Sequence, residues 1–274
     1  MHTGQPDYLD CPEGKQHTMM GGHHAASGAA AWVAVASTAP YALGIYPVSP
    51  LGVVSGALLT AGAALLPDLD HHSGTIAHSL PPLTRILAKI TEQISGGHRR
   101  GTHSLLGLAV FVAVAGALGE LTAEVPGFGT VEVGAGLLSV LLMGFALKAL
   151  KIAGGAGRSW LLAILLSVFI ALYAPENNGW LPLAVGLGVA VHIVGDLLTH
   201  QGVMILWPLR IKRPRKIASM PLLAKFWKTS GCLSLPIIGR AGSWREWAIM
   251  VPVSVYAVYG VIEGSFNALR DWLT

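Results

Sequence analysis

A histidine and an aspartate stand four residues apart in the segment Ala190–Gly202, which reads AVHIVGDLLTHQG. On a helix, His192 and Asp196 therefore share one face. An imidazole and a carboxylate at this spacing can bind one metal ion from a single helix. The surrounding segment is apolar, and ionisable groups inside a membrane span are costly enough to indicate a function. The alternative is a buried polar pair whose members satisfy each other within a helix bundle.

A second cluster of ligand-type residues follows an apolar run that ends near Leu66. The sequence LLPDLDHH places Asp68 and Asp70 directly after this run, because Pro67 is expected to end the helix. Carboxylates at a helix C-terminus are electrostatically unfavourable, so a nearby cation explains them better than capping does. Alternate acids in a loop can reach one ion or two adjacent ions, and their oxygen atoms suit hard or borderline metals.

The third cluster reads GGHRRGTHSLLG and holds His98 and His103 on either side of two arginines. Thr102 is predicted to be the N-cap of the next helix, which puts His103 in its first turn. Histidines beside Arg99 and Arg100 make a poor site for a metal alone. They make a good site for a metal and a phosphate, because the arginines can face the oxyanion. The alternative is a basic membrane anchor in which the histidines are incidental.

The elements that must position these clusters are membrane helices. The chain is 53% hydrophobic and 12% charged, whereas soluble domains are about 25% charged. Its apolar residues form seven runs, several of them near the roughly 20 residues that cross a bilayer. The runs are Ala25–Leu43, Leu51–Leu66, Ser104–Leu118, Val133–Leu147, Trp160–Ala174, Leu181–Leu198 and Trp247–Val261. They lack the polar stripe of soluble helices, so the sequence predicts an all-α, polytopic transmembrane bundle of about seven spans.

Basic residues set the predicted orientation. With the N-terminus in the cytoplasm, the inside loops hold all but one of the 18 Lys and Arg residues, as the positive-inside rule requires. This asymmetry explains the net charge of +4 without a nucleic-acid partner. The basic stretch 210–216 is expected to bind anionic membrane lipid, and the amphipathic stretch Leu83–Ile94 to lie along the interface or over the site. Cys11 and Cys232 fall on predicted cytoplasmic segments, where thiols stay reduced.

Four parts are expected along the chain. Residues 1–22 form a flexible cytoplasmic tail, and residues 23–209 form the membrane-embedded core. A basic cytoplasmic loop covers residues 210–245, and residues 246–274 contain the final transmembrane helix.

This topology brings the ligand-type residues together at one membrane face. His24, in GGHHAASGAA, begins the first apolar run. The cytoplasmic ends of the first, second, third and sixth spans then carry seven potential ligands: His24, Asp68, Asp70, His98, His103, His192 and Asp196. Such a set of imidazoles and carboxylates suits a divalent metal such as zinc, with two or more ions close together.

Four motifs in this order carry a resemblance to a known family. HHAASG, LLPDLDH, GHRRGTHSLLG and HIVGDLLTHQGV…LWPL resemble the motifs of the YdjM-like, LexA-regulated inner-membrane metal-dependent hydrolases. That family is distantly similar to the zinc-dependent phospholipase C and P1 nuclease group. The resemblance covers roughly Gly22–Pro208, and it implies a hydrolase of the inner membrane without naming a substrate. The chain departs from it by reading HRRGTHS where relatives read HRGxTHS, and by a longer stretch between Leu118 and Leu181.

The analogy with the phospholipase C group implies a ligand set. One metal would be bound by Asp68, His103, His192 and Asp196, and Asp196 could bridge to a second ion held by His24 or His98. Thr102 and Thr199 would orient the ligands.

The same analogy implies the chemistry. The metal would activate water for attack on a phosphoester, with Asp70 as general base or further ligand. Arg99 or Arg100 would stabilise the charge that develops on phosphorus.

Three classes of function remain open at this point. The leading expectation is a membrane-embedded, metal-dependent hydrolase at the cytoplasmic face, acting on a phosphoester of a lipid or lipid-linked substrate. A metal or proton transporter would carry ionisable groups on toward the opposite face, and here they stop at one side. A non-catalytic membrane protein with a structural metal would need only one closed site, and this set holds more ligands than that. The sequence leaves the substrate and the oligomeric state undefined.

Overall fold

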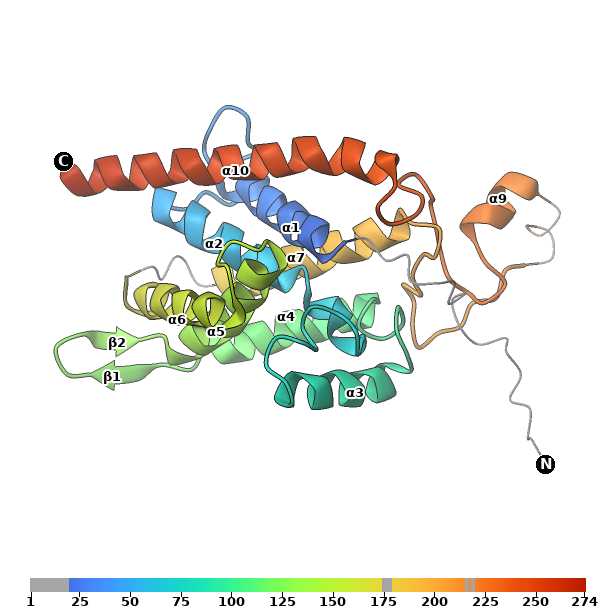
Figure 1. Cartoon of the computed structure of the whole chain (residues 1–274), viewed down its shortest axis with the longest axis horizontal. Coiled ribbons are helices and arrows are strands. Elements are labelled where there is room, and N and C mark those ends of the chain that lie inside the picture. Colours follow the sequence, from blue (N-terminus) through green and yellow to red (C-terminus); the bar gives the residue numbers. More distant parts are fainter. Residues whose placement is uncertain (1–19, 174–178, 215–216, 218–219) are drawn as a thin grey trace.

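The computed structural model describes residues 20–173, 179–214, 217 and 220–274, and this part is mostly helical (Figure 1). The helices are α1 (Gly21–Ala36), α2 (Pro50–Ala63), the 3₁₀ helix η1 (Leu66–Asp70), α3 (Leu83–Ser95), α4 (Leu105–Gly119), α5 (Val133–Ala149), α6 (Ala156–Tyr173), α7 (Trp180–Leu197), α9 (Pro221–Phe226) and α10 (Trp244–Leu273). Two short strands, β1 (Ala123–Val125) and β2 (Gly129–Val131), form an antiparallel hairpin.

Several helices are suited to a membrane. The three that are long and apolar enough to cross one are Pro50–Asp70, Trp180–Leu197 and Trp244–Leu273. Shorter apolar helices occupy Leu105–Gly119, Val133–Ala149 and Ala156–Ala171. The described chain is therefore a mostly helical protein with membrane-compatible helices, as the sequence predicted, whereas the number of seven spans stays a prediction.

Helix α1 lies at the centre of the bundle and packs against α2, α7 and α10. Small residues permit this packing: a Cβ atom added to Gly28 would lie 2.5 Å from the Thr60 carbonyl oxygen. The contact between α2 and α5 is closer still, since a Cβ atom on Gly62 would lie 1.9 Å from the Leu142 carbonyl oxygen. Glycine is thus required where these helices approach backbone to backbone.

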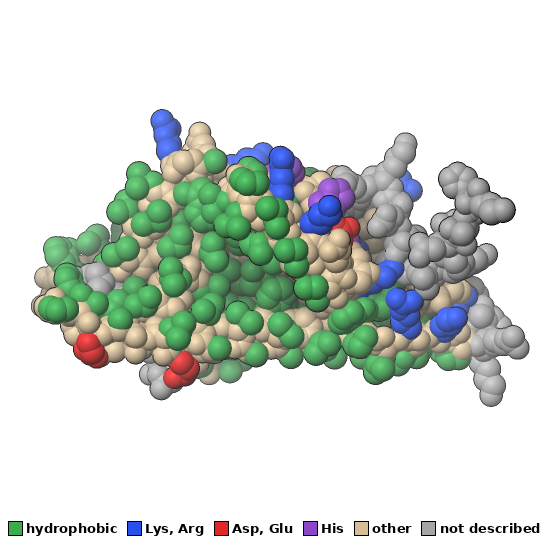
Figure 2. All heavy atoms as spheres, turned by 90° about the horizontal axis from the view of Figure 1, so that it is seen from below, with side chains coloured by type: hydrophobic (Ala, Val, Ile, Leu, Met, Phe, Trp, Pro, Cys, Tyr) green, Lys and Arg blue, Asp and Glu red, His purple; other side chains and the backbone are tan. Residues whose placement is uncertain are grey.

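Hydrophobic side chains remain on the outside of the bundle. Val110 on α4, Leu161 on α6 and Val255 on α10 are each at least half exposed. Figure 2 shows a face that hydrophobic side chains dominate, with lysines and arginines mainly along its upper edge and over its right half. An apolar exterior of this extent fits contact with lipid chains better than contact with water.

Helix α3 is amphipathic, and its apolar face points outward. Its large apolar residues Leu83, Ile86, Leu87, Ile90 and Ile94 are between 44% and 74% exposed. Its buried side chains are small ones that pack on the protein. A helix that presents a regular Leu and Ile stripe to its surroundings matches one that lies in the plane of a membrane interface.

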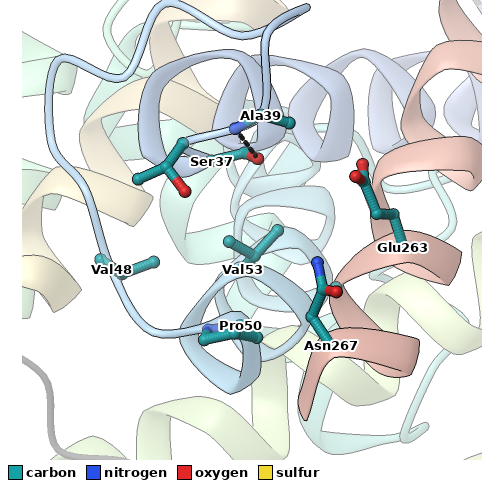
Figure 3. Close-up of a pocket in the computed structure, with 9 residues that line it drawn as sticks. Ser37, Ala39, Val48, Pro50, Val53, Glu263 and Asn267 are labelled. Carbon is teal, nitrogen blue, oxygen red and sulfur yellow. Dashed lines mark hydrogen bonds between the residues drawn. The ribbon is translucent and has the colours of Figure 1, made fainter. Parts of the chain in front are cut away.

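A small pocket lies at the end of α1 that is remote from His24 (Figure 3). Its volume is about 100 Å³, and Ser37, Pro50, Glu263 and Asn267 are among its lining residues. The Tyr41 hydroxyl donates a hydrogen bond to Glu263 nearby.

The structure corrects five details of the sequence prediction. The N-cap of α4 is Ser104, whose hydroxyl accepts from the Gly107 amide, so the predicted cap Thr102 and His103 both precede the helix. The all-α expectation missed the β1–β2 hairpin, whose strands of three residues are too short and exposed to give a periodic signal. Helix α1 ends at Ala36 because the backbone becomes extended at Ser37. Helix α10 continues to Leu273 because the polar residues after Val261 interrupt hydrophobicity but not helical geometry. Cys232 is buried and disulfide-bonded, so the expected reduced thiol is wrong there.

Some predictions fall on other parts of the chain. The expected tail, except its last residues, and Cys11 lie outside the described residues, as do four positions of the basic loop. The predicted four-part organisation remains a prediction.

Candidate metal centre

Four separate segments place histidines and aspartates at one end of the bundle. His24 comes from the first turn of α1, Asp68 and Asp70 from η1, His103 from the residues before α4, and His192 and Asp196 from the last turns of α7. Five of these six side chains are buried, and the sixth, Asp68, is 17% exposed. Groups of them lie close enough to hold a metal ion together.

The geometry at the centre fits one tetrahedral ion. The Nε2 atoms of His103 and His192 are 3.1 Å apart. Asp196 Oδ2 lies 3.4 Å and 3.7 Å from these two nitrogens, and Asp68 Oδ1 lies 3.8 Å and 3.7 Å from them. Bonds of about 2.0–2.2 Å to a tetrahedral zinc ion require ligand atoms about 3.3–3.6 Å apart. These five distances lie close to that range, and Asp68, His103 and His192 form one group that could hold an ion.

Hydrogen bonds behind the two histidines point their free nitrogens into this centre. His192 Nδ1 lies 2.7 Å from the carbonyl oxygen of Ala64, so Nδ1 carries the proton and Nε2 presents its lone pair. His103 Nδ1 lies 3.0 Å from the Thr102 hydroxyl and 3.5 Å from Asp70 Oδ2, on the side away from His192. Two lone pairs 3.1 Å apart repel each other unless a cation or a proton lies between them.

Several buried atoms have no hydrogen-bond partner within the described part of the chain. At the centre they are both ring nitrogens of His24, Nε2 of His98, Oδ2 of Asp196 and Nε of Arg99. Buried polar atoms are nearly always satisfied, and an ion is one of the few explanations for a cluster of exceptions. His24 also stacks on His192, with ring centroids 3.8 Å apart, and its Nε2 lies 3.6 Å from Asp196 Oδ1. The donor set and its unpaired atoms therefore fit a divalent metal.

Asp70 sits behind the centre, in contact with three neighbours. Its Oδ1 accepts a hydrogen bond of 2.7 Å from His98 Nδ1, and its Oδ2 accepts one of 2.5 Å from the Thr102 hydroxyl. The side chain is fully buried. The sequence prediction made Asp70 a general base or a further ligand. Asp70, His98 and His103 lie close enough to hold an ion together, so the role of a further ligand stays a prediction. The same contacts also suit a carboxylate that orients two histidines.

Electrostatics hold a proton in the metal-free centre. Burial by itself would lower the pKa of His103, but the charge of Asp70, together with Asp68 and Asp196, raises it to about 10. A positive charge between these carboxylates is therefore strongly favoured, whether a proton or a metal supplies it.

The two arginines that were predicted to face an oxyanion contact protein groups. Arg99 is buried and forms an ion pair of 2.9 Å with Asp196 Oδ1, and it also donates to the Thr199 hydroxyl and the Gly202 carbonyl. Its backbone is left-handed, with φ of 63°. The Arg100 guanidinium donates to the Gly96 carbonyl. Arg99 thus fixes one oxygen of Asp196 and leaves the other directed at the two histidines.

One functional contact was missed from the sequence. Glu246, in the first turn of α10, is fully buried and accepts hydrogen bonds from His23 Nδ1 at 2.5 Å, from the Met20 amide and from the Gly242 amide. It ties α10 to the start of α1, next to His24. The available signal was that Glu246 is the first acid after a long basic loop. The same contact explains why His23 does not join the cluster.

Fold and site together define a mostly helical membrane protein with a buried His/Asp cluster that could hold a metal ion. The sequence profile of the YdjM inner membrane protein family matches residues 19–150 and 155–266, and the chain belongs to this family. No curated protein and no solved structure shows significant similarity to the chain. The expected similarity to the phospholipase C and P1 nuclease group is not shown by these comparisons.

Proposed function

We propose that the protein is a membrane-embedded, metal-dependent hydrolase that cleaves a phosphoester of a lipid or lipid-linked substrate. The observation that carries the proposal is the set of four ligand atoms from His103, His192, Asp196 and Asp68, spaced for one tetrahedral ion. Asp68 is the most exposed of these ligands, so the side of the centre that it borders is the side open to a substrate. Catalytic metal sites keep a coordination position for water, so four protein ligands require the ion to take the water as a fifth ligand, on the side that Asp68 borders.

Each neighbouring residue has a defined task in this proposal. A bound divalent ion, zinc by the character of its ligands, supplies an activated water and a Lewis acid. Asp70 holds His103 and His98 in orientation, and Arg99 neutralises the inner oxygen of Asp196. His24 has both nitrogens unpaired, so it is the residue best placed to bind a second ion together with Asp196.

Two features support a substrate that belongs to the membrane. The centre lies at the end of the bundle where η1 contacts α3, the helix whose apolar face points outward. Arg100 lies three residues from His103 and brings positive charge to the same region. A phosphate on a lipid headgroup would sit at this depth, where carboxylate-bound metal and arginine both favour its charge.

Seven spans with the N-terminus and the metal centre at the cytoplasmic face are also part of the proposal. The distribution of Lys and Arg supports this orientation. The disulfide at Cys232 supports the opposite one, because disulfides are typical of oxidising compartments. Reporter fusions after Thr274 distinguish the two: periplasmic activity supports the proposed orientation with an odd number of spans, and cytoplasmic fluorescence contradicts it.

The test of the function is hydrolysis by the purified, reconstituted protein. We expect release of phosphate or a phosphorylated headgroup from anionic phospholipids, which a chelator abolishes and zinc restores. Asp68→Asn should remove this activity, whereas Glu124→Gln, a matched change on the exposed hairpin, should not.

Other results of the same experiments would favour one of the two alternative functions, a transporter or a membrane protein with a structural metal. Metal uptake into vesicles without hydrolysis would identify a transporter, and a bound metal with neither activity would identify a structural site.

A further inference from the structure

An apolar groove of about 380 Å³ runs between α3 and α4, beside the metal centre. Its large lining residues are Leu69, Ile94, Leu106, Val110, Phe111 and Trp207. Ligand pockets in proteins commonly have volumes of about 300–1,000 Å³ and apolar walls, so its size and lining suit a small-molecule or chain-like ligand.

The groove opens toward the side of the protein that faces lipid. Leu106 and Val110 on α4 are about half exposed, and Ile94 on α3 is 74% exposed. The outward Leu and Ile stripe of α3 borders the same opening. A hydrocarbon chain can therefore enter the groove from the bilayer without crossing water. In the groove, the chain exchanges its contacts with lipid chains for contacts with apolar side chains.

The inner wall of the groove is joined to the metal centre. Leu69 stands between Asp68 and Asp70 in η1. Thr102 also lines the groove, and its hydroxyl donates to Asp70 and lies 3.0 Å from His103 Nδ1. A molecule in the groove would thus contact Leu69, the residue next to Asp68 in the sequence, and Asp68 is the most exposed metal-binding candidate of the centre.

A positive side chain lies near one end of the groove. A Cβ atom built on Gly96 would lie 3.4 Å from Trp207 Nε1 and 3.9 Å from both Cδ and an Nη of Arg100. Trp207 and Arg100 therefore lie close to the same glycine. An indole that lines the groove beside a guanidinium is the combination that meets a lipid at the level of its headgroup, where apolar chain changes to charged phosphate.

We propose that the α3–α4 groove binds the hydrocarbon chain of a phosphorylated membrane lipid and holds its phosphoester at the Asp68 side of the metal centre. The part that concerns the phosphoester rests on the proposed function. The part that concerns the chain rests on the groove itself: its apolar walls, its opening to lipid and its contact with Thr102.

Photo-crosslinking tests the chain site without requiring turnover. The full-length protein is placed in nanodiscs of phosphatidylcholine and phosphatidylglycerol that contain phosphatidic acid with a diazirine near the end of one acyl chain. After irradiation, labelled peptides are identified by mass spectrometry. We expect the label to be enriched on α3 and α4 over α6, whose apolar face is equally exposed to bulk lipid.

Two tryptophan substitutions on α4 make the test specific. Val110→Trp fills the groove and should lower labelling of α3 to the level found on α6, because the indole occupies the space that the chain would take. Val114→Trp, one turn further along α4 and also half exposed, lies outside the groove lining and should leave labelling unchanged. Leu106→Trp serves as a second groove-filling variant if Val110→Trp does not fold, as judged by helicity and gel filtration.

The outcomes separate this inference from the proposed function. Equal labelling of α3, α4 and α6, or labelling of α3 that the groove-filling variants do not change, overturns the chain site even if metal-dependent hydrolysis is found. A dimer that gel filtration detects and Val110→Trp disrupts would identify α4 as a dimer surface and also overturn it. Enriched labelling that Val110→Trp abolishes supports the chain site even if no hydrolysis is detected.

Discussion

Replacing Asp70 with asparagine tests whether this carboxylate orients the metal ligands. Asp70 accepts hydrogen bonds from His98 Nδ1 and the Thr102 hydroxyl, at 2.7 Å and 2.5 Å, and lies 3.5 Å from His103 Nδ1. Asparagine keeps the shape of the side chain but removes its charge and turns one acceptor into a donor. The asparagine oxygen can accept from only one of the two donors, and the negative charge beside His103 Nδ1 is lost.

The magnitude follows from the place of Asp70 behind the ligands. Loss of a carboxylate that orients a metal-binding histidine costs about 10–100-fold in metal affinity. This corresponds to about 1.4–2.7 kcal/mol of binding free energy. Substitution of a residue that binds the ion directly would cost far more metal-binding free energy. One of the four metal–ligand bonds would be lost, and the charges of the remaining ligands would be uncompensated in a buried site.

Competition with a chromophoric zinc chelator measures the change in affinity in detergent solution. The expected result for Asp70→Asn is zinc affinity lowered by about 10–100-fold with one ion still bound at saturation. Glu124→Gln, an equivalent change on the exposed hairpin, should have no effect. Unchanged affinity in Asp70→Asn would refute the orienting role, and complete loss of binding would show that Asp70 is itself a ligand.

Three further predictions concern protons, a buried carboxylate and helix packing. The pKa of His103 is raised to about 10, so below that pH zinc must displace the His103 proton before it can bind. Titration calorimetry should therefore show a zinc affinity that rises about tenfold per pH unit from pH 7 toward 9. A zinc affinity that does not change with pH contradicts this. Glu246→Ala leaves the buried His23 ring without its acceptor, together with two backbone amides of exposed residues. It should lower the unfolding free energy by about 1–3 kcal/mol, with a smaller loss in Glu246→Gln, as measured by urea unfolding. Gly62→Ala should lower the melting temperature markedly, because the added Cβ atom would clash with the α5 backbone. Gly116→Ala should not, because the space around its Cβ atom is open. Equal melting temperatures of the two variants would contradict the close α2–α5 contact.

Sequence reasoning was strongest for the residues that meet at the metal centre. Apolar runs and basic loops were enough to predict that seven ligand-type residues meet at one end of the bundle: His24, Asp68, Asp70, His98, His103, His192 and Asp196. The structure does bring these seven side chains into three overlapping groups that could each hold a metal ion. The spacing of residues within each motif could not predict the distances between ligand atoms of different motifs, because those distances depend on how the helices pack.

The details that were missed depend on contacts between distant segments. Arg99 was expected to face an oxyanion, but it pairs with Asp196, which lies 97 residues away in the chain. Glu246 binds His23 across 223 residues, and no local pattern records such a pairing. The outward orientation of α3 was within reach of sequence, because its Leu and Ile stripe is regular. The groove beside it was not, because it exists only where α3 and α4 lie together.

The most direct test of the account is the metal content of the purified protein, with any affinity tag removed, compared with that of His192→Ala. The account predicts at least one tightly bound divalent ion per native chain, with an X-ray absorption spectrum of nitrogen and oxygen ligands only, and loss of this ion in the variant. A folded native protein that binds no ion stoichiometrically after exposure to zinc, or a variant that keeps the same metal content, would contradict it.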